Sequence, residues 1–205
     1  REKGQVTRAI QMHQQLLRRP KLTKLEHAYI QLCLALDFRR GGFVDRALEA
    51  FTEVLRFDAD NTYALLNLEK LHEEQHQWEE AYAIRRRLAA LADPGQEQKH
   101  QAILAFLETQ LGQQSLQRGE HAAAVSRFES AVDLDARAVP AYVSLGDMRR
   151  EEGRVDEALA TWERLIAIAP ERAHLVFDRV EAVSREQGDA ERFPALCRRL
   201  IAANP

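Results

Sequence analysis

Apolar residues recur along this chain in short helical blocks that are separated by turn residues. The blocks share one phrase: a glycine, four residues, an alanine, three residues, a large apolar residue, two residues, and a small or apolar residue. Gly153 leads in this way to Ala158, Trp162 and Leu165. Such spacing is typical of amphipathic helices, so the pattern predicts an all-α fold built from a repeated unit.

The phrase recurs at a nearly constant period. Copies begin at Gly4, Gly42, Gly119 and Gly153, and degenerate copies begin at His76 and Gly188. The anchor positions of the six copies are Ala9, Ala47, Ala81, Ala124, Ala158 and Phe193. Their separations are 38, 34, 43, 34 and 35 residues, so the base period is 34. That length fits two helices of about a dozen residues and two tight turns.

The period divides the chain into hairpins of two helices. We expect an N-terminal half repeat at residues 5–18 and hairpins near 24–58, 62–92, 97–135, 139–169 and 172–203. Stacked side by side, about five hairpins form a right-handed superhelix, and we expect one domain over residues 1–205. Extra residues fall around 19–21 and 93–95, where loops or helix extensions are expected. The second insertion allows a bend near residues 92–97.

Small and large residues alternate within the phrase. Gly112 and Gly146 are expected to let the paired helices approach closely, while Phe128 and Trp162 fill the space between hairpins. Gly42, Gly119, Gly153 and Gly188 are expected in the left-handed conformation that ends the first helix of a pair.

Two copies resemble the consensus of the tetratricopeptide repeat family. The residues of the fuller copy are Tyr142, Leu145, Gly146, Gly153, Ala158, Trp162, Leu165 and Pro170. Those of the second copy are Leu111, Gly112, Gly119, Ala124, Phe128 and Ala131. The resemblance implies a solenoid whose first helices line a concave groove that binds other proteins.

The composition indicates that the chain can fold unaided and that binding depends on local surface rather than on overall charge. Apolar residues make up 45% of the 205 positions, and 29 basic against 32 acidic residues give a net charge of −3. We therefore expect no nucleic acid partner, and we interpret the arginine clusters, including 85–87 and 149–150, as solvated helix faces. Cys33 and Cys197 are interpreted as buried thiols. No run approaches the roughly 18 apolar residues of a membrane span, so no direct membrane contact is expected from this segment.

One motif suggests an enzyme. Residues His72 to His76 read His-Glu-Glu-Gln-His, which matches the zinc protease pattern H-E-x-x-H. In the repeat register, however, His72 takes the packing position of Phe38 and Arg149, and His76 replaces the turn glycine. We expect His76 to leave the helix, and we assign no catalytic residue, metal ligand or cofactor. A zinc hydrolase remains an alternative, which predicts stoichiometric zinc.

The predicted binding residues are first-helix positions that the repeat pattern does not commit to packing. In the first two hairpins they are Tyr29, Leu32, Leu36, Arg39, Arg40, Tyr63, Leu66, Lys70, Glu73 and Glu74. In the third and fourth hairpins they are Phe106, Thr109, Gln113, Leu116, Val143, Asp147 and Arg150. Aromatic and leucine side chains at these positions suit a peptide or helix ligand, although some can instead pack on the neighbouring hairpin.

The first 90 residues carry a closer resemblance. The opening Arg1 to Val6, the Tyr29 to Gly42 helix and the Trp78-Glu79-Glu80-Ala81 step are similar to repeats of the bacterial lipopolysaccharide assembly protein B family. That resemblance implies a cytoplasmic domain at the inner face of the bacterial inner membrane, held there by an N-terminal helix and followed by a rubredoxin-like zinc domain. Since the sequence starts at Arg1 and stops in mid-pattern, we expect a piece of a longer protein.

The same resemblance implies an adaptor function. In that family the repeats link a membrane AAA protease to the deacetylase of lipid A synthesis, and so balance lipopolysaccharide production. A generic bacterial scaffold for secretion or cell-envelope assembly, with other partners in the same groove, remains the alternative.

Overall fold

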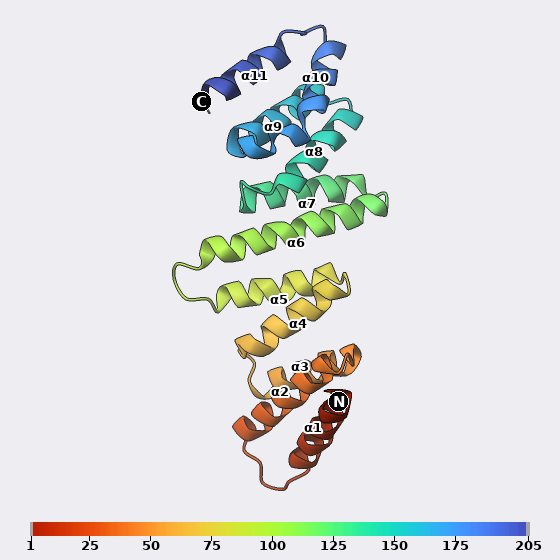
Figure 1. The fold of residues 1–205 in the computed structure, drawn as a ribbon, viewed down its shortest axis with the longest axis vertical. Coiled ribbons are helices and arrows are strands. Elements are labelled where there is room, and N and C mark those ends of the chain that lie inside the picture. The colour runs from red at the N-terminus through yellow and green to blue at the C-terminus, as the bar shows by residue number, and fades with distance from the viewer. Residues whose placement is uncertain (1, 204–205) are drawn as a thin grey trace. The chain divides into compact units, whose positions relative to one another are not determined.

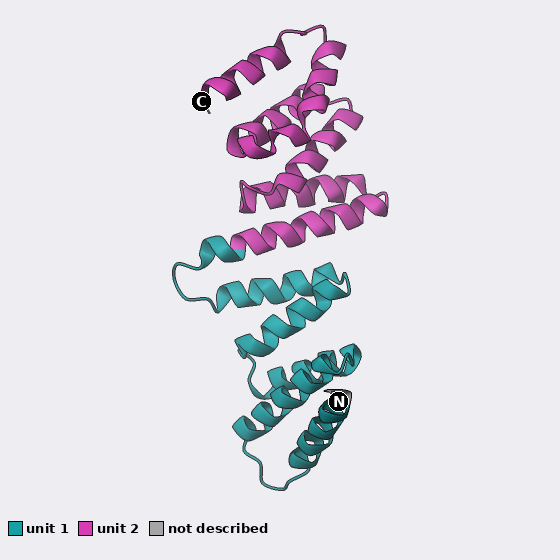
Figure 2. Ribbon diagram, in the orientation of Figure 1, with its two compact units in different colours: residues 1–100 teal, residues 101–205 magenta. Residues whose placement is uncertain are grey.

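The computed structural model describes residues 2–203, which fold into helices joined by turns and contain no strand (Figure 1). The chain divides into two compact units, residues 1–100 and residues 101–205 (Figure 2). The predicted all-α fold of paired helices is confirmed. The prediction of one domain with a bend near residues 92–97 stays a prediction.

Unit 1 is a series of antiparallel helices, each packed on the next. Its helices are α1 (Glu2–Leu17), α2 (Lys24–Arg40), α3 (Val44–Phe57), α4 (Thr62–Glu74) and α5 (Trp78–Ala90). Their bounds match the half repeat and the first two predicted hairpins. Phe51, which comes from the repeated phrase, is the largest fully buried side chain of the cluster formed by α1 to α4.

Unit 2 continues the pattern from within α6 (Glu97–Gln117). Its further helices are α7 (His121–Leu134), α8 (Val139–Glu151), α9 (Val155–Ile168), the 3-10 helix η1 (Pro170–Leu175), α10 (Phe177–Glu186) and α11 (Arg192–Ala203). The core of this unit includes Phe128, Tyr142 and Trp162, all at most 1% exposed.

Turn residues end the helices as the sequence indicates. Gly42, Gly119, Gly153 and Gly188 all have φ between 76° and 78°. Thr23 forms a capping box at the start of α2, where its hydroxyl accepts from the Glu26 amide and the Glu26 carboxylate accepts from the Thr23 amide. The Thr23 amide and, second, the Thr23 hydroxyl donate to the Glu26 carboxylate and lower the pKa of this exposed carboxyl.

Close packing within hairpins depends on a pair of residues sixteen positions apart, one on each helix, which we call the crossing pair. In unit 2 the pairs are Gly112 with Phe128 and Gly146 with Trp162. A Cβ atom at Gly112 would lie 2.7 Å from the Phe128 ring, and one at Gly146 would lie 2.1 Å from the Trp162 indole nitrogen. Only glycine therefore allows these rings to fill the space against the first helix.

The second complete hairpin of unit 1 has a charged crossing pair. Glu69 stands at the small position and Arg85 at the aromatic position, and both are buried. Arg85 donates from Nε to Glu69 Oε1 at 2.5 Å and from a terminal nitrogen to the other carboxylate oxygen. The first complete hairpin instead holds Ala35 and Phe51, both fully buried.

Two predicted regions differ in detail from the structure. Residues 170–175 form a 3-10 helix, so the first helix of the last hairpin begins at Phe177 rather than near 172. This 3-10 turn packs on α9 and buries Ala173 and Val176. The insertion near 93–95 is divided between a loop, in which Gly95 has φ of 94°, and a 21-residue α6.

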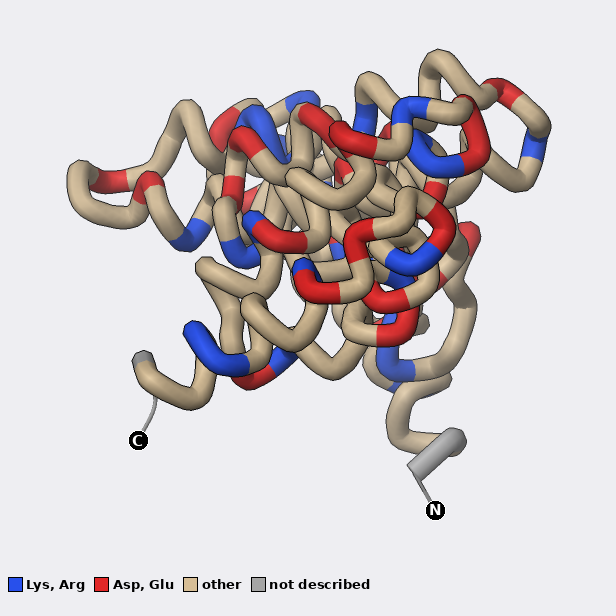
Figure 3. Tube along the Cα trace, turned by 90° about the horizontal axis from the view of Figure 1, so that it is seen from above, with Lys and Arg blue, Asp and Glu red and all other residues tan. Residues whose placement is uncertain are grey.

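The interpretation of the arginine clusters needs correction. Acidic and basic segments are interspersed along the chain trace, as expected (Figure 3). Arg85, however, is buried against Glu69, and the Arg149 side chain is 18% exposed, because each has a carboxylate partner on a packed helix.

Two further properties follow from the described residues. Cys33 and Cys197 are half-buried free thiols rather than fully buried ones, since each lies at the border of a packed helix face. Partial burial raises the pKa of the Cys33 thiol.

Within residues 2–203, every helix is too short or too polar to span a bilayer.

Candidate functional site

The first helices of unit 1 expose large apolar side chains. Tyr29 on α2 is 68% exposed, and Tyr63 and Leu66 on α4 are 52% and 45% exposed. Tyr29 and Tyr63 occupy equivalent positions, because they lie 34 residues apart in consecutive repeats. We call Tyr29, Tyr63 and Leu66 the unit 1 face. Exposed aromatic residues at a regular spacing are the composition expected of a protein-binding surface.

Polar contacts connect α2 to α4 beside these residues. Arg39 donates to the Asn67 side-chain oxygen and lies 3.5 Å from a Glu74 carboxylate oxygen. Asn67 also donates to the Tyr63 carbonyl oxygen at 2.8 Å and is buried. The link holds the two helices in register, so Arg39 has a structural task within the fold in addition to its predicted contact with a partner.

Leu32 and Leu36 of the predicted set are half-buried and pack against the core of unit 1. They contribute only part of their surface to the exterior. Arg40 and Lys70 are exposed. Glu73 is half-buried, and its partial burial raises the pKa of its carboxyl, although Arg85 and Lys70 act in the opposite direction. Charges of both signs therefore border the unit 1 face.

In unit 2 the residues predicted on α6 have different surroundings. Phe106 is 48% exposed. Thr109 is buried, and its hydroxyl donates to the Ala105 carbonyl oxygen at 2.7 Å in the same helix. Its side chain is consequently not accessible to a partner, which corrects the prediction of exposure at this position. Gln113 and Leu116 are half-buried.

The residues predicted on α8 connect this helix to α10. Asp147 accepts two hydrogen bonds from Arg179, at 2.6 Å and 2.8 Å, which raise the pKa of the guanidinium. Arg150 donates to Glu186 at 2.8 Å. Val143 packs against the core of unit 2. These side chains stabilise neighbouring repeats, as the sequence pattern allowed.

The geometry at the His72 motif does not suit a zinc protease. Helix α4 ends at Glu74, and His76 has φ of 57°, so it lies in the turn as predicted. The His72 ring nitrogen Nδ1 lies 2.6 Å from the Gln77 side-chain oxygen. The motif needs both imidazoles on one helix face. Among residues 2–203, no three side chains of His, Cys, Asp or Glu are grouped to hold a metal.

Comparison with known proteins supports the repeat assignment. A family model described as "Tetratricopeptide repeat" matches residues 141–176. The lipopolysaccharide assembly protein B of Escherichia coli K12 is 20% identical over 204 residues, which cover 100% of this chain and 51% of the relative. This chain thus spans about half the length of that relative. A probable N-acetylglucosaminyltransferase SPINDLY of Hordeum vulgare is 29% identical over 120 residues, 58% of this chain and 12% of that protein.

Two solved structures match this chain at low sequence identity. YrrB, described as a tetratricopeptide repeat protein with an unusual peptide-binding site, matches with a TM-score of 0.49 and 17% identity, covering 96% of this chain and 94% of its own. A crystal structure of MamA matches with a TM-score of 0.47 and 21% identity, covering 82% of this chain and 93% of its own.

Proposed function

We propose that this chain, a tetratricopeptide repeat protein, is a scaffold that binds partner proteins through the exposed faces of its first helices. The observation that carries the proposal is the unit 1 face, where Tyr29, Tyr63 and Leu66 are each at least 45% exposed. Exposed apolar patches on soluble proteins commonly mark protein interaction sites. Tyrosine is also among the residues that dominate binding energy at interfaces.

The structure of the surface favours a peptide or helix as ligand. Tyr63 and Leu66 lie three residues apart, so they are neighbours on one side of α4. An extended or helical segment can contact them together with Tyr29 on α2. The Arg39 to Asn67 hydrogen bond fixes the two helices before binding, and this lowers the ordering cost of association.

The finer proposal is a function in lipopolysaccharide control. It rests on the 20% identity of this chain to about half of lipopolysaccharide assembly protein B and on the resemblance of the first 90 residues to that family. On this proposal the chain acts in the cytoplasm at the bacterial inner membrane, and its partners are a membrane AAA protease and enzymes of lipid A synthesis. It acts as an adaptor and not as an enzyme.

The test is a binding titration with the purified cytoplasmic part of the AAA protease and with the lipid A deacetylase from the same bacterium. We expect Tyr63→Ala together with Leu66→Ala to weaken binding at least about thirtyfold, because a tyrosine at a binding hot spot carries about 2 kcal/mol. The matched control is Met12→Ala, which truncates a 51% exposed apolar side chain. Met12 lies on α1, which corresponds to the second helix of a hairpin and not to a first helix.

The outcomes separate the coarse proposal from the fine one. Weakened binding in the double variant, with unchanged binding in the control, supports both. Binding to neither protein removes the lipopolysaccharide proposal. If a partner is bound equally well by the double variant and the wild type, the unit 1 face does not carry the scaffold function.

A further inference from the structure

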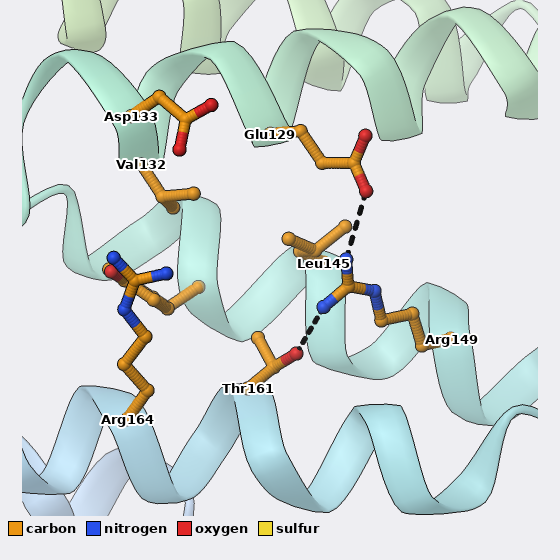
Figure 4. A pocket seen from close by; sticks show the side chains of 8 residues that line it. Glu129, Val132, Asp133, Leu145, Arg149, Thr161 and Arg164 are labelled. Carbon is orange, nitrogen blue, oxygen red and sulfur yellow. Dashed lines mark hydrogen bonds and ion pairs between the residues drawn. The ribbon is translucent and has the colours of Figure 1, made fainter.

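A small pocket in unit 2 lies among α7, α8 and α9, on a different side of α8 from the predicted binding residues. Its volume is about 270 Å³, and its lining includes Glu129, Asp133, Tyr142, Arg149 and Arg164 (Figure 4). Tyr142 and Arg149 lie seven residues apart, on one side of α8. Val143, Asp147 and Arg150 lie on another side of the same helix.

Two hydrogen-bond donors of the lining have no partner among the described residues. The first is the Tyr142 hydroxyl, which belongs to a side chain that is 1% exposed. The second is Arg149 Nε, although the Glu157 carboxylate lies 4.0 Å away. A buried polar group without a partner costs free energy, so each such group in a native fold calls for an explanation.

Of the two arginines that line the pocket, Arg149 is already paired and Arg164 can receive a ligand. The terminal nitrogens of Arg149 already donate to Glu129 at 2.9 Å and to Thr161 at 2.6 Å (Figure 4). Arg164 is exposed, and its guanidinium carbon lies 5.7 Å from the centre of the Tyr142 ring. Burial raises the pKa of the Tyr142 phenol, which therefore remains a donor at neutral pH.

We propose that this pocket binds a carboxylate group, which accepts from the Tyr142 hydroxyl and pairs with the Arg164 guanidinium. An arginine and a hydroxyl donor together suit a carboxylate, because the guanidinium presents parallel N–H groups to its two oxygens. A monoanion fits better than a dianion such as phosphate. Glu129 and Asp133 already balance the two arginines, and Glu157 lies 4.0 Å from Arg149 Nε, so each further negative charge on the ligand adds repulsion and a monoanion is favoured over a dianion.

The corresponding pocket of unit 1 differs in chemistry from the unit 2 pocket. That pocket has a volume of about 410 Å³ and is lined by Gln31, Phe38 and Glu53 where the unit 2 pocket has Tyr142, Arg149 and Arg164. Glu53 is paired with Arg56 at 2.8 Å. The unit 1 pocket has an exposed arginine, Arg46, but no buried phenol, so it is an internal control for the contribution of the Tyr142 hydroxyl.

The carboxylate can come from a free organic acid or from the C-terminus of a peptide. We would titrate the protein with sodium acetate, with N-acetyl-glycyl-glycine, and with the C-terminal amide of the same dipeptide. The readout is the NMR signal of the Arg164 side-chain Nε–H group. We expect saturable shifts with the two acids and none with the amide, and dissociation constants in the millimolar range, as small ligands allow. Tighter binding of the dipeptide acid would indicate a peptide source, and equal binding a free acid.

Two conservative variants keep the proposal open to refutation. Tyr142→Phe retains the ring and removes only the hydroxyl, and Arg164→Gln removes the charge from an exposed position. Each is expected to weaken carboxylate binding about tenfold, the loss typical of one hydrogen bond to a charged group. Absence of a saturable shift at Arg164 would overturn the proposal. Unchanged affinity in Tyr142→Phe would overturn it too, and so would equal shifts at residues of the unit 1 pocket.

Discussion

Arg85 donates from Nε to Glu69 Oε1 at 2.5 Å, at the two positions where other hairpins of the chain place a small residue and an aromatic ring. Both side chains are buried, at 6% and 3% exposure. The ion pair therefore replaces a hydrophobic contact at the centre of a hairpin. Desolvation of two charges offsets most of their attraction, so such a pair adds little stability compared with apolar residues of similar size.

This relationship predicts opposite effects for single and double substitution. Glu69→Ala leaves Arg85 buried without a partner and is expected to lower the free energy of unfolding by about 3–5 kcal/mol. The double variant Glu69→Ala with Arg85→Phe reproduces the Ala35 and Phe51 pair of the preceding hairpin, and it is expected to recover or exceed wild-type stability. Urea unfolding of the three proteins measures both effects. A double variant as unstable as Glu69→Ala would show that the surroundings require the ion pair.

The same region predicts a pH dependence centred on His100. This side chain is 8% exposed, and its Nδ1 atom has no hydrogen-bond partner among the described residues. Burial lowers the pKa of His100, and the nearby charges of Arg85 and Lys99 lower it further. Below about pH 6.5, the unfolded chain takes up a proton on this residue that the folded chain does not.

The contribution of His100 to stability should consequently fall as the pH decreases from about 6.5 towards the lowered pKa of this residue. The slope from one such group is at most about 1.4 kcal/mol per pH unit. His100→Leu is expected to flatten this part of the profile, which unfolding measurements at a series of pH values would detect. An identical slope in the wild type and the variant would rule out His100 as its source.

Much of the fold could be predicted from the sequence, because the repeat is defined by residues that set the backbone geometry of turns or fill the space between helices. Gly153 marks a left-handed turn and Trp162 marks a filled interface, whatever their neighbours are. The hairpin bounds followed from these anchors and from the period. The start of the last hairpin did not, since the 3-10 turn at residues 170–175 depends on packing against α9.

The candidate site was less accessible to prediction. Exposure of Tyr29 and Tyr63 followed from their register, but burial of Thr109 depends on the tertiary surroundings of α6. The buried Glu69 and Arg85 pair was missed, because charge alone suggested a solvated face. A signal was nevertheless present, since both residues stand at crossing-pair positions of the 34-residue register. The unit 2 pocket could not be predicted from the sequence pattern, because its lining combines residues from three helices.

Gly146 provides a direct test of the crossing pair. A methyl group there would lie 2.1 Å from the Trp162 indole nitrogen, so Gly146→Ala must displace a fully buried ring. We expect a loss of about 1–3 kcal/mol in the free energy of unfolding, the usual cost of overpacking. The control is Gly4→Ala on α1, where nothing lies within 4 Å of the added methyl group. Higher helix propensity should make that variant neutral or more stable by up to about 1 kcal/mol.

His76 gives the last prediction, because it separates the structural and the catalytic interpretations of its motif. The residue has φ of 57°, while the glycines at equivalent turns have φ of 76° to 78°. A side chain in the left-handed region is strained by roughly 1 kcal/mol, and glycine is not. His76→Gly should thus raise the free energy of unfolding by about 1 kcal/mol, whereas His76→Ala should not. Zinc content is measured on the same samples. A zinc ligand would lose its metal and its stability in both variants, so destabilisation by His76→Gly together with loss of bound zinc would restore the hydrolase alternative.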